Sequence, residues 1–116
     1  MAVHSGGCHC GAVRYEVEGD FSSVIECNCS HCAAKGFLLA FAPREAFTLK
    51  SGADALSEYT FNTGKIRHQF CKTCGVQPFA YGVGPDGSEM AAVNVRCVDG
   101  ADPAALTVTP VNGKDF

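Results

Sequence analysis

The chain has 116 residues, a length that fits one domain over residues 1–116. Hydrophobic residues make up 47% of it, which excludes an intrinsically disordered chain. Twelve acidic against nine basic residues give a net charge of −3, which argues against a protein that binds nucleic acid through a broadly basic surface. No apolar run approaches the roughly 20 residues of a membrane-spanning helix. The first seven residues lack the basic and apolar regions of a signal peptide, so we expect a cytoplasmic protein.

Short runs of strand-forming residues, separated by turn residues, predict a mainly β domain. The first run, over residues 11–17, alternates apolar and polar residues, and the second, over 23–27, leads directly into a group of cysteines. One helical turn with Ser30 as its N-cap is predicted over 30–34. An apolar run over 37–41 then predicts a buried strand that the next proline ends.

The second half of the chain continues the same pattern. Strands are predicted over 47–50, 56–61, 66–70, 78–83 and 90–98, of which the last is the clearest. Turns are predicted at 62–65 and 84–87. A short helix is predicted over 102–105, because a proline follows an aspartate that can cap it.

Eight cysteines form three groups and one isolated position. In the reducing compartment that we expect, grouped cysteines are typical of metal ligands or catalytic thiols rather than of disulfides. A secreted disulfide framework is the alternative. Closely spaced thiols favour chelation, since neighbours can both point at one ion. The isolated Cys97 is expected to be a small buried hydrophobic residue and belongs to neither of the sites described next.

The two outer groups are pairs, Cys8 with Cys10 and Cys71 with Cys74, and a glycine directly follows each pair. Glycine can adopt the positive φ that lets a chain turn tightly around a metal ion. Four thiolates provide the tetrahedral ligand set of a structural zinc site. We therefore predict one closed zinc site on these four residues. The alternative is two unrelated buried pairs.

The middle group places Cys27, Cys29 and Cys32 within six residues and contains no glycine. Three protein ligands with a vacant fourth position are typical of a catalytic zinc. Zinc with three thiolates has a net charge of −1, so it activates water weakly but can still bind an incoming thiolate. The pattern favours sulfur chemistry over hydrolysis. Two alternatives remain: His31 or another histidine closes a structural site, or the group binds no metal and is redox-active.

These motifs resemble the glutathione-dependent formaldehyde-activating family. The segments that carry the resemblance span nearly the whole chain and are residues 7–11, 27–32, 43–47, 70–75 and 112–116. The resemblance implies a β-tent fold of short antiparallel sheets built around a structural zinc. It implies two zinc ions per chain, a structural one on Cys8, Cys10, Cys71 and Cys74 and a catalytic one on Cys27, Cys29 and Cys32.

The activity that the resemblance implies is the joining of glutathione and formaldehyde into S-(hydroxymethyl)glutathione, which is classed as carbon–sulfur lyase activity. We therefore expect a small thiol such as glutathione as partner. Basic side chains could bind its carboxylates, and the candidates are Lys35, Arg44, Arg67 and His68. The family is also similar to centromere protein V. The alternative function is therefore a non-catalytic zinc-binding module for a protein or nucleic-acid partner, although the acidic composition weighs against nucleic acid.

Overall fold

The computed structural model of the chain describes residues 3–19, 21, 23–28, 30–60, 66–84 and 86–111. The strands are β1 (Val3–Gly7), β2 (Arg14–Glu18), β3 (Ser23–Cys27), β4 (Leu39–Pro43), β5 (Phe47–Ser51), β6 (Leu56–Tyr59), β7 (Arg67–Cys71), β8 (Phe79–Val83), β9 (Glu89–Asn94) and β10 (Thr107–Val111). The helical segments are α1 (Ser30–Lys35) and the short 3₁₀ helices η1 (Arg44–Ala46), η2 (Ala53–Ala55), η3 (Val95–Cys97) and η4 (Pro103–Ala105). The prediction of a mainly β fold is confirmed.

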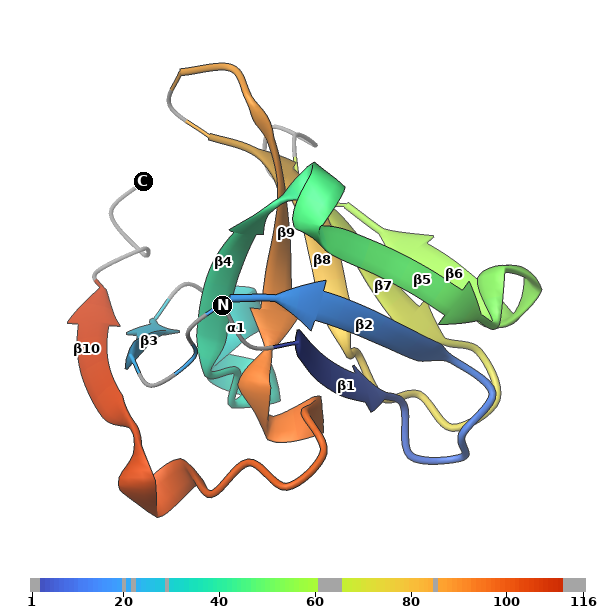
Figure 1. The fold of residues 1–116 in the computed structure, drawn as a ribbon, viewed down its shortest axis with the longest axis horizontal. Coiled ribbons are helices and arrows are strands. Elements are labelled where there is room, and N and C mark those ends of the chain that lie inside the picture. The colour runs from blue at the N-terminus through green and yellow to red at the C-terminus, as the bar shows by residue number, and fades with distance from the viewer. Residues whose placement is uncertain are drawn as a thin grey trace.

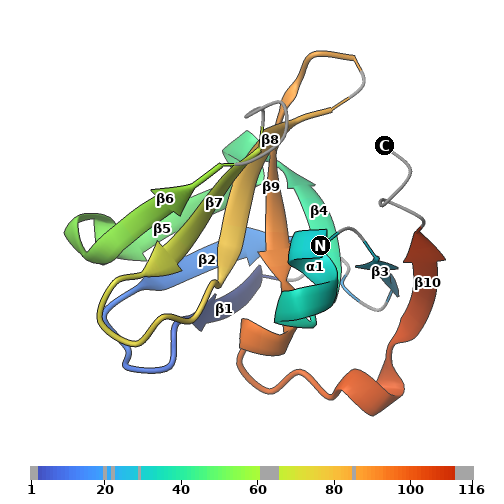
Figure 2. The same ribbon diagram turned by 180° about the vertical axis from the view of Figure 1, so that it is seen from behind.

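The strands form two sheets (Figure 1). The small sheet has the order β1-β2-β5, and the large sheet has the order β10-β3-β4-β9-β8-β7-β6. All described pairs of neighbouring strands are antiparallel except β10 and β3, which are parallel. The small sheet lies against one face of the large sheet, and the view from behind shows α1 on the opposite face (Figure 2). The large sheet therefore has a face toward the small sheet and a face toward α1.

Aromatic side chains fill the space between the two sheets. Tyr15 of β2 and Phe47 of β5 pack on Phe79 of β8, with ring centroids 6.0 Å and 4.7 Å apart. The three residues are at most 3% exposed. Burial of a side chain of this size stabilises a fold by roughly 1.5–3 kcal/mol. The alternation predicted for residues 11–17 matches β2, in which Tyr15 and Val17 are buried while Glu16 is exposed.

Two strands have no counterpart among the predicted ones. The sequence of β1 has no clear period-two alternation, and β10 contains Pro110. Proline cannot donate a backbone hydrogen bond, so it weakens a strand pattern, but an edge strand tolerates it. Because β10 lies at the edge of the large sheet, Pro110 does not prevent its pairing with β3. In β10, the strand-forming residues that could have been recognised are Thr107, Val108, Thr109 and Val111.

The strand predicted over residues 90–98 is shorter in the structure. β9 ends at Asn94, and the 3₁₀ helix η3 follows. The side chain of Asn94 accepts a hydrogen bond from the backbone N–H of Arg96 at 3.2 Å, which offers the backbone an alternative to the strand ladder. The short helix predicted over 102–105 is found as η4, and Asp102 caps it by accepting from the N–H of Ala104 at 3.1 Å.

Some predictions fall on residues outside the described ranges. They are the turn at 62–65, the C-terminal segment 112–116 and Cys29 of the middle cysteine group. The helix predicted over 30–34 is found as α1, but Ser30 is its first residue and not the predicted N-cap. In the described part of the chain, no helix has the length and apolar character needed to cross a membrane.

Candidate functional site

The two glycine-ended cysteine pairs meet at one point. The four Sγ atoms of Cys8, Cys10, Cys71 and Cys74 all lie within 4.8 Å of one another. The Sγ of Cys10 is 3.6 Å from that of Cys8 and 3.7 Å from that of Cys71. Four sulfur ligands at about 2.3 Å from a tetrahedral zinc are about 3.8 Å apart. The spacing and the chemistry of this four-cysteine cluster therefore fit a tetrahedral metal ion that prefers thiolates.

Local turns place the four thiols. Gly11 and Gly75 have φ values of +84° and +79°, as the glycine positions predict. The N–H of Gly75 donates to the carbonyl of Cys71 at 2.7 Å, which closes the second turn. Cys71 ends β7 in the large sheet, whereas Cys8 directly follows β1 in the small sheet. The four-cysteine cluster therefore joins the two sheets at one end of the molecule.

The thiols of the four-cysteine cluster differ in how readily they lose a proton. A hydrogen bond from the backbone N–H of Val76 is the main cause that lowers the pKa of Cys74, to about 6. For Cys10, the N–H of Ala12 lowers the pKa, but the hydrogen bond with Cys8 and burial outweigh it and raise the pKa to about 11. A metal ion would have to displace the proton of Cys10, so binding to the cluster should release protons.

The middle cysteine group lies where β3 leads into α1. Cys27 is half-buried at the end of β3, and Cys32 is buried in α1. Both side chains line a pocket of about 440 Å³, one wall of which is formed by Pro110 and Val111 of β10. The N–H of Asn28 donates to the carbonyl of Val111 at 3.1 Å, which holds this wall in place. Sequence reasoning missed the wall because it missed β10.

His31 lies between the cysteines of the middle group in the sequence, but it is not among the residues that line this pocket. Its ring stacks on Tyr59 of β6, with centroids 5.5 Å apart, and is 4.2 Å from the ring of His68 in β7. Burial lowers the pKa of His31, and it lowers the pKa of His68 to about 4. Both histidines are therefore neutral imidazoles at neutral pH.

The four candidate residues for binding substrate carboxylates separate onto the two faces of the large sheet. His68 contacts His31 of α1, and the Nζ of Lys35 in α1 lies 5.9 Å from the ring of Phe70 in β7. These two candidates are on the face that α1 covers. Lys35 does not line the pocket of the middle cysteines.

Arg67 and Arg44 are on the face of the large sheet that α1 does not cover. Arg67 precedes His68 in β7, and successive side chains of a strand point to opposite faces. Arg67 and Arg44 both contact the ring of Tyr81, which packs against Phe47 of the small sheet. The structure therefore does not bring these two arginines to the middle cysteine group.

A network of buried polar residues, which no sequence pattern indicated, links β7 to the end of β9. The side-chain amide nitrogen of Gln77 is 3.0 Å from Nδ1 of His68. The side chain of Asn94 donates to the backbone carbonyl of Gln77 at 3.1 Å, and its Nδ2 is 3.6 Å from the Sγ of Cys97. His68, Gln77 and Asn94 are at most 8% exposed. Polar residues in strand patterns are usually on the solvent side, so their burial gives no local signal.

Cys97 is the last member of this polar network. It is a half-buried thiol in η3 and not a residue of a strand. Burial is the main cause that raises its pKa to about 11, so it remains protonated. It is not part of the four-cysteine cluster, as predicted. The described cysteines all carry free thiols, so the described part of the chain shows no disulfide framework.

Two comparisons show which known proteins this chain is similar to. Residues 3–110 match the sequence model of the family described as glutathione-dependent formaldehyde-activating enzyme. A crystal structure of a Rhodobacter sphaeroides protein, 34% identical in sequence, superposes with a TM-score of 0.79. The alignment covers 90% of this chain and 99% of that chain. Both matches extend over most of the chain.

Proposed function

The chain belongs to the glutathione-dependent formaldehyde-activating family, and on this premise we propose that it is a zinc-dependent carbon–sulfur lyase. It adds a small, glutathione-like thiol reversibly to formaldehyde or a similar electrophile. With glutathione and formaldehyde, the product is S-(hydroxymethyl)glutathione. The observation that carries this proposal is the pocket lined by both Cys27 and Cys32, separate from the four-cysteine cluster.

In this proposal the four-cysteine cluster has a structural role. Cys8, Cys10, Cys71 and Cys74 hold one zinc ion and leave no position for a substrate, because four thiolates complete a tetrahedron. The sulfur–sulfur distances near 3.7 Å support this assignment. The cluster joins the two sheets, so its metal affinity contributes to the free energy of folding.

The middle cysteine group has the catalytic role. Cys27, Cys29 and Cys32 would hold a second zinc ion, which supplies an open position that can accept a substrate thiolate. The pocket between β3, α1 and β10 would position the thiol beside the carbonyl compound, and Pro110 and Val111 form one of its walls. A carbon–sulfur bond forms, and the thiol proton is transferred to the carbonyl oxygen.

Two further parts of the proposal concern the surroundings of the protein. Its partner is a small thiol, and it acts in the cytoplasm, where cysteine ligands remain reduced. The free thiols of the described cysteines support this. The alternative is a non-catalytic zinc module that binds a protein or nucleic acid, and the acidic charge balance speaks against nucleic acid.

Cobalt substitution tests the proposed function. The protein is loaded with cobalt, its metal content is counted, and its absorption spectrum is recorded with and without glutathione. We expect two ions per chain and a glutathione-dependent spectral change at one of them, which Cys32→Ser abolishes. In parallel, ¹³C-formaldehyde and glutathione are mixed with the zinc protein, and NMR follows the formation of S-(hydroxymethyl)glutathione. We expect the protein to accelerate this reaction.

The opposite results would favour the alternative. If glutathione leaves the cobalt spectrum unchanged and the zinc protein does not accelerate the reaction, the proposed enzyme activity is wrong. Titration with duplex DNA at several salt concentrations then tests the binding module, since phosphate contacts produce steep salt dependence.

A further inference from the structure

Two arginines contact one tyrosine on the face of the large sheet that α1 does not cover. The Cζ atom of Arg44 in η1 is 4.5 Å from the ring centre of Tyr81, and that of Arg67 in β7 is 5.3 Å from it. Arg67 and Tyr81 are paired across β7 and β8, which places them on the same face of the sheet. Arg44, Arg67 and Tyr81 are called the arginine–tyrosine cluster below.

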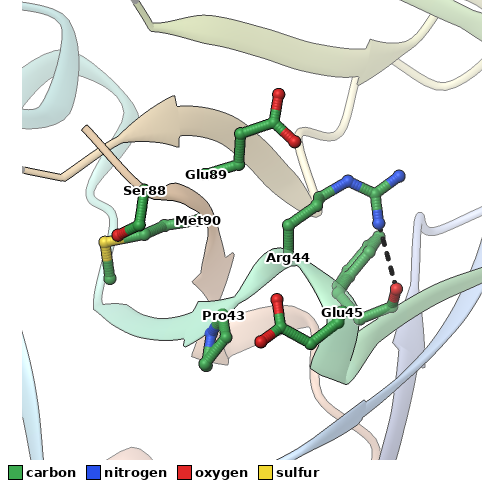
Figure 3. A pocket seen from close by; sticks show the side chains of 7 residues that line it. Pro43, Arg44, Glu45, Ser88, Glu89 and Met90 are labelled. Carbon is green, nitrogen blue, oxygen red and sulfur yellow. Dashed lines mark hydrogen bonds between the residues drawn. The ribbon is translucent and has the colours of Figure 1, made fainter.

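Arg44 is held in position by two contacts. One terminal nitrogen donates to the backbone carbonyl of Phe47 at 3.0 Å (Figure 3). The other is 3.5 Å from the hydroxyl oxygen of Tyr81, at the long end of a hydrogen bond. A guanidinium has five N–H donors, so these contacts leave others available to a ligand. Because Arg44 is already ordered, binding would require little additional loss of conformational entropy.

No carboxylate of the described residues forms an ion pair with the arginines of the cluster, although Glu89 lines the cavity beside them. In the described ranges, the ion pairs join Arg14 with Asp99 and Lys50 with Glu16, and neither Arg44 nor Arg67 forms one. Two guanidinium ions around one ring repel each other, and an anion between them would relieve that repulsion. Burial raises the pKa of Tyr81, although the arginines oppose this shift, so its hydroxyl stays protonated and can donate to an anion.

The space beside the cluster has the size of a small ligand. Arg44, Arg67 and Tyr81 line a cavity of about 40 Å³. A water molecule occupies about 30 Å³ of liquid, so this cavity accommodates a group such as a carboxylate. Arg44, Glu89 and Met90 also line a second, larger pocket of about 680 Å³, which Figure 3 shows. The larger pocket can hold the remainder of a molecule whose acidic group occupies the small cavity.

We propose that the arginine–tyrosine cluster binds the carboxylate of a small organic acid. The planar guanidinium matches the two oxygens of a carboxylate. Glu89 lines the same cavity and disfavours a doubly charged group such as phosphate. The site is distinct from the middle cysteine group, since Arg67 and His68 point to opposite faces of the sheet and His68 faces α1. The proposal therefore depends neither on the proposed reaction nor on a metal ion.

NMR spectroscopy of the zinc-loaded, ¹⁵N-labelled protein tests the site. Sodium acetate or inorganic phosphate is added at constant ionic strength, and the side-chain Nε–H signals of Arg44 and Arg67 are followed with the backbone N–H of Gly82. We expect saturable shifts of these signals with acetate. The main variant is Arg67→Gln, because Arg67 is exposed and its loss should leave the fold intact. It should weaken acetate binding about tenfold.

Three further variants make the test specific. Tyr81→Phe keeps the ring but removes the hydroxyl donor and should weaken acetate binding severalfold. Glu89→Gln removes a repulsive charge and should strengthen it. Lys50→Gln makes the same charge change as Arg67→Gln but on β5, so acetate binding should be unchanged. Shifts that grow linearly without saturation, equal loss in Lys50→Gln and Arg67→Gln, or saturation with phosphate but not with acetate would each overturn the proposal.

Discussion

The side-chain amide nitrogen of Gln77 lies 3.0 Å from Nδ1 of His68, and both side chains are only 5% exposed. An amide nitrogen donates, so Nδ1 of His68 accepts, and the neutral imidazole carries its proton on Nε2. Burial, together with the nearby charges of His31 and Lys35, lowers the pKa of His68 to about 4. The fold therefore favours the neutral form of this histidine.

The first prediction is a loss of stability in acid that depends on His68. The ordinary pKa of 6.5 applies to the unfolded chain, so between pH 6.5 and 4 the unfolded state binds the proton more readily. The free energy of unfolding should fall as the pH decreases through this window and level off below it. The contribution is about 3 kcal/mol, since the pKa falls from 6.5 to about 4.

Denaturant melts of the wild type and His68→Gln at a series of pH values measure this effect. Glutamine retains a hydrogen-bond acceptor for Gln77 but does not titrate, so the variant should lose less stability between pH 6.5 and 4. Both proteins carry the same cysteine groups, so acid release of a bound metal ion would cancel in the difference. Parallel curves would show that His68 does not titrate as described.

The second prediction concerns two zinc ions of unequal lability. The four-cysteine cluster joins two sheets, whereas the middle group would, in the proposed function, supply its three ligands from one short segment. Mild chelation should therefore remove about one equivalent of zinc while the far-ultraviolet circular dichroism remains unchanged. Simultaneous loss of both ions, together with loss of structure, would contradict an open second site.

The third prediction separates the two cysteine groups by substitution. Cys71 is fully buried in the four-cysteine cluster, and Cys71→Ala should prevent stable folding. Cys27 is half-buried beside the pocket, so Cys27→Ala should leave a folded protein with one zinc ion. Thermal melts with metal analysis compare the two. Equal destabilisation would mean that the middle group is also structural.

The fourth prediction concerns two glycines with similar backbone conformations. Gly52 and Gly87 have φ values of +90° and +84°. A Cβ on Gly52 would be 2.3 Å from the carbonyl oxygen of Ala12, whereas a Cβ on Gly87 would meet nothing within 4 Å. Gly87→Ala should cost only the unfavourable φ, about 1 kcal/mol. Gly52→Ala should cost about 2 kcal/mol more, because the backbone must also move.

Chemical denaturation of both glycine variants measures the difference in their free energies of unfolding. Because the φ values are alike, the difference isolates the contact with the β1–β2 connection, where Ala12 lies. Equal free energies would show that this connection moves away at little cost.

The fifth prediction concerns Lys35 and the charge of the thiol. Lys35 is exposed, and its ammonium lies over Phe70 rather than in the pocket of Cys27 and Cys32. Lys35→Ala should therefore weaken glutathione binding by about 1 kcal/mol or less and leave β-mercaptoethanol unaffected. Calorimetry with both thiols measures this, with Lys50→Ala as the control. A larger loss, shared by both thiols, would place Lys35 in direct contact with the bound sulfur.

The sequence by itself determined the mainly β fold, most of the strands and the two cysteine pairs of the four-cysteine cluster. These are local features. Strand alternation has a period of two residues, and Cys71 and Cys74 lie within one short loop that Gly75 closes. A local pattern is visible in the chain before any long-range contact forms. The same reasoning anticipated that Cys97 would stand apart from the four-cysteine cluster.

The tertiary structure alone decided which side chains share a face or a pocket. Arg67 and His68 are neighbours in the sequence, yet Arg67 contacts Tyr81 and His68 contacts α1. Which face each side chain occupies depends on sheet order and register, which contacts between distant segments set. The same holds for Val111, which reaches the middle cysteine group only because β10 pairs in parallel with β3. No local pattern encodes such a pairing, because its partners are about 80 residues apart in the chain.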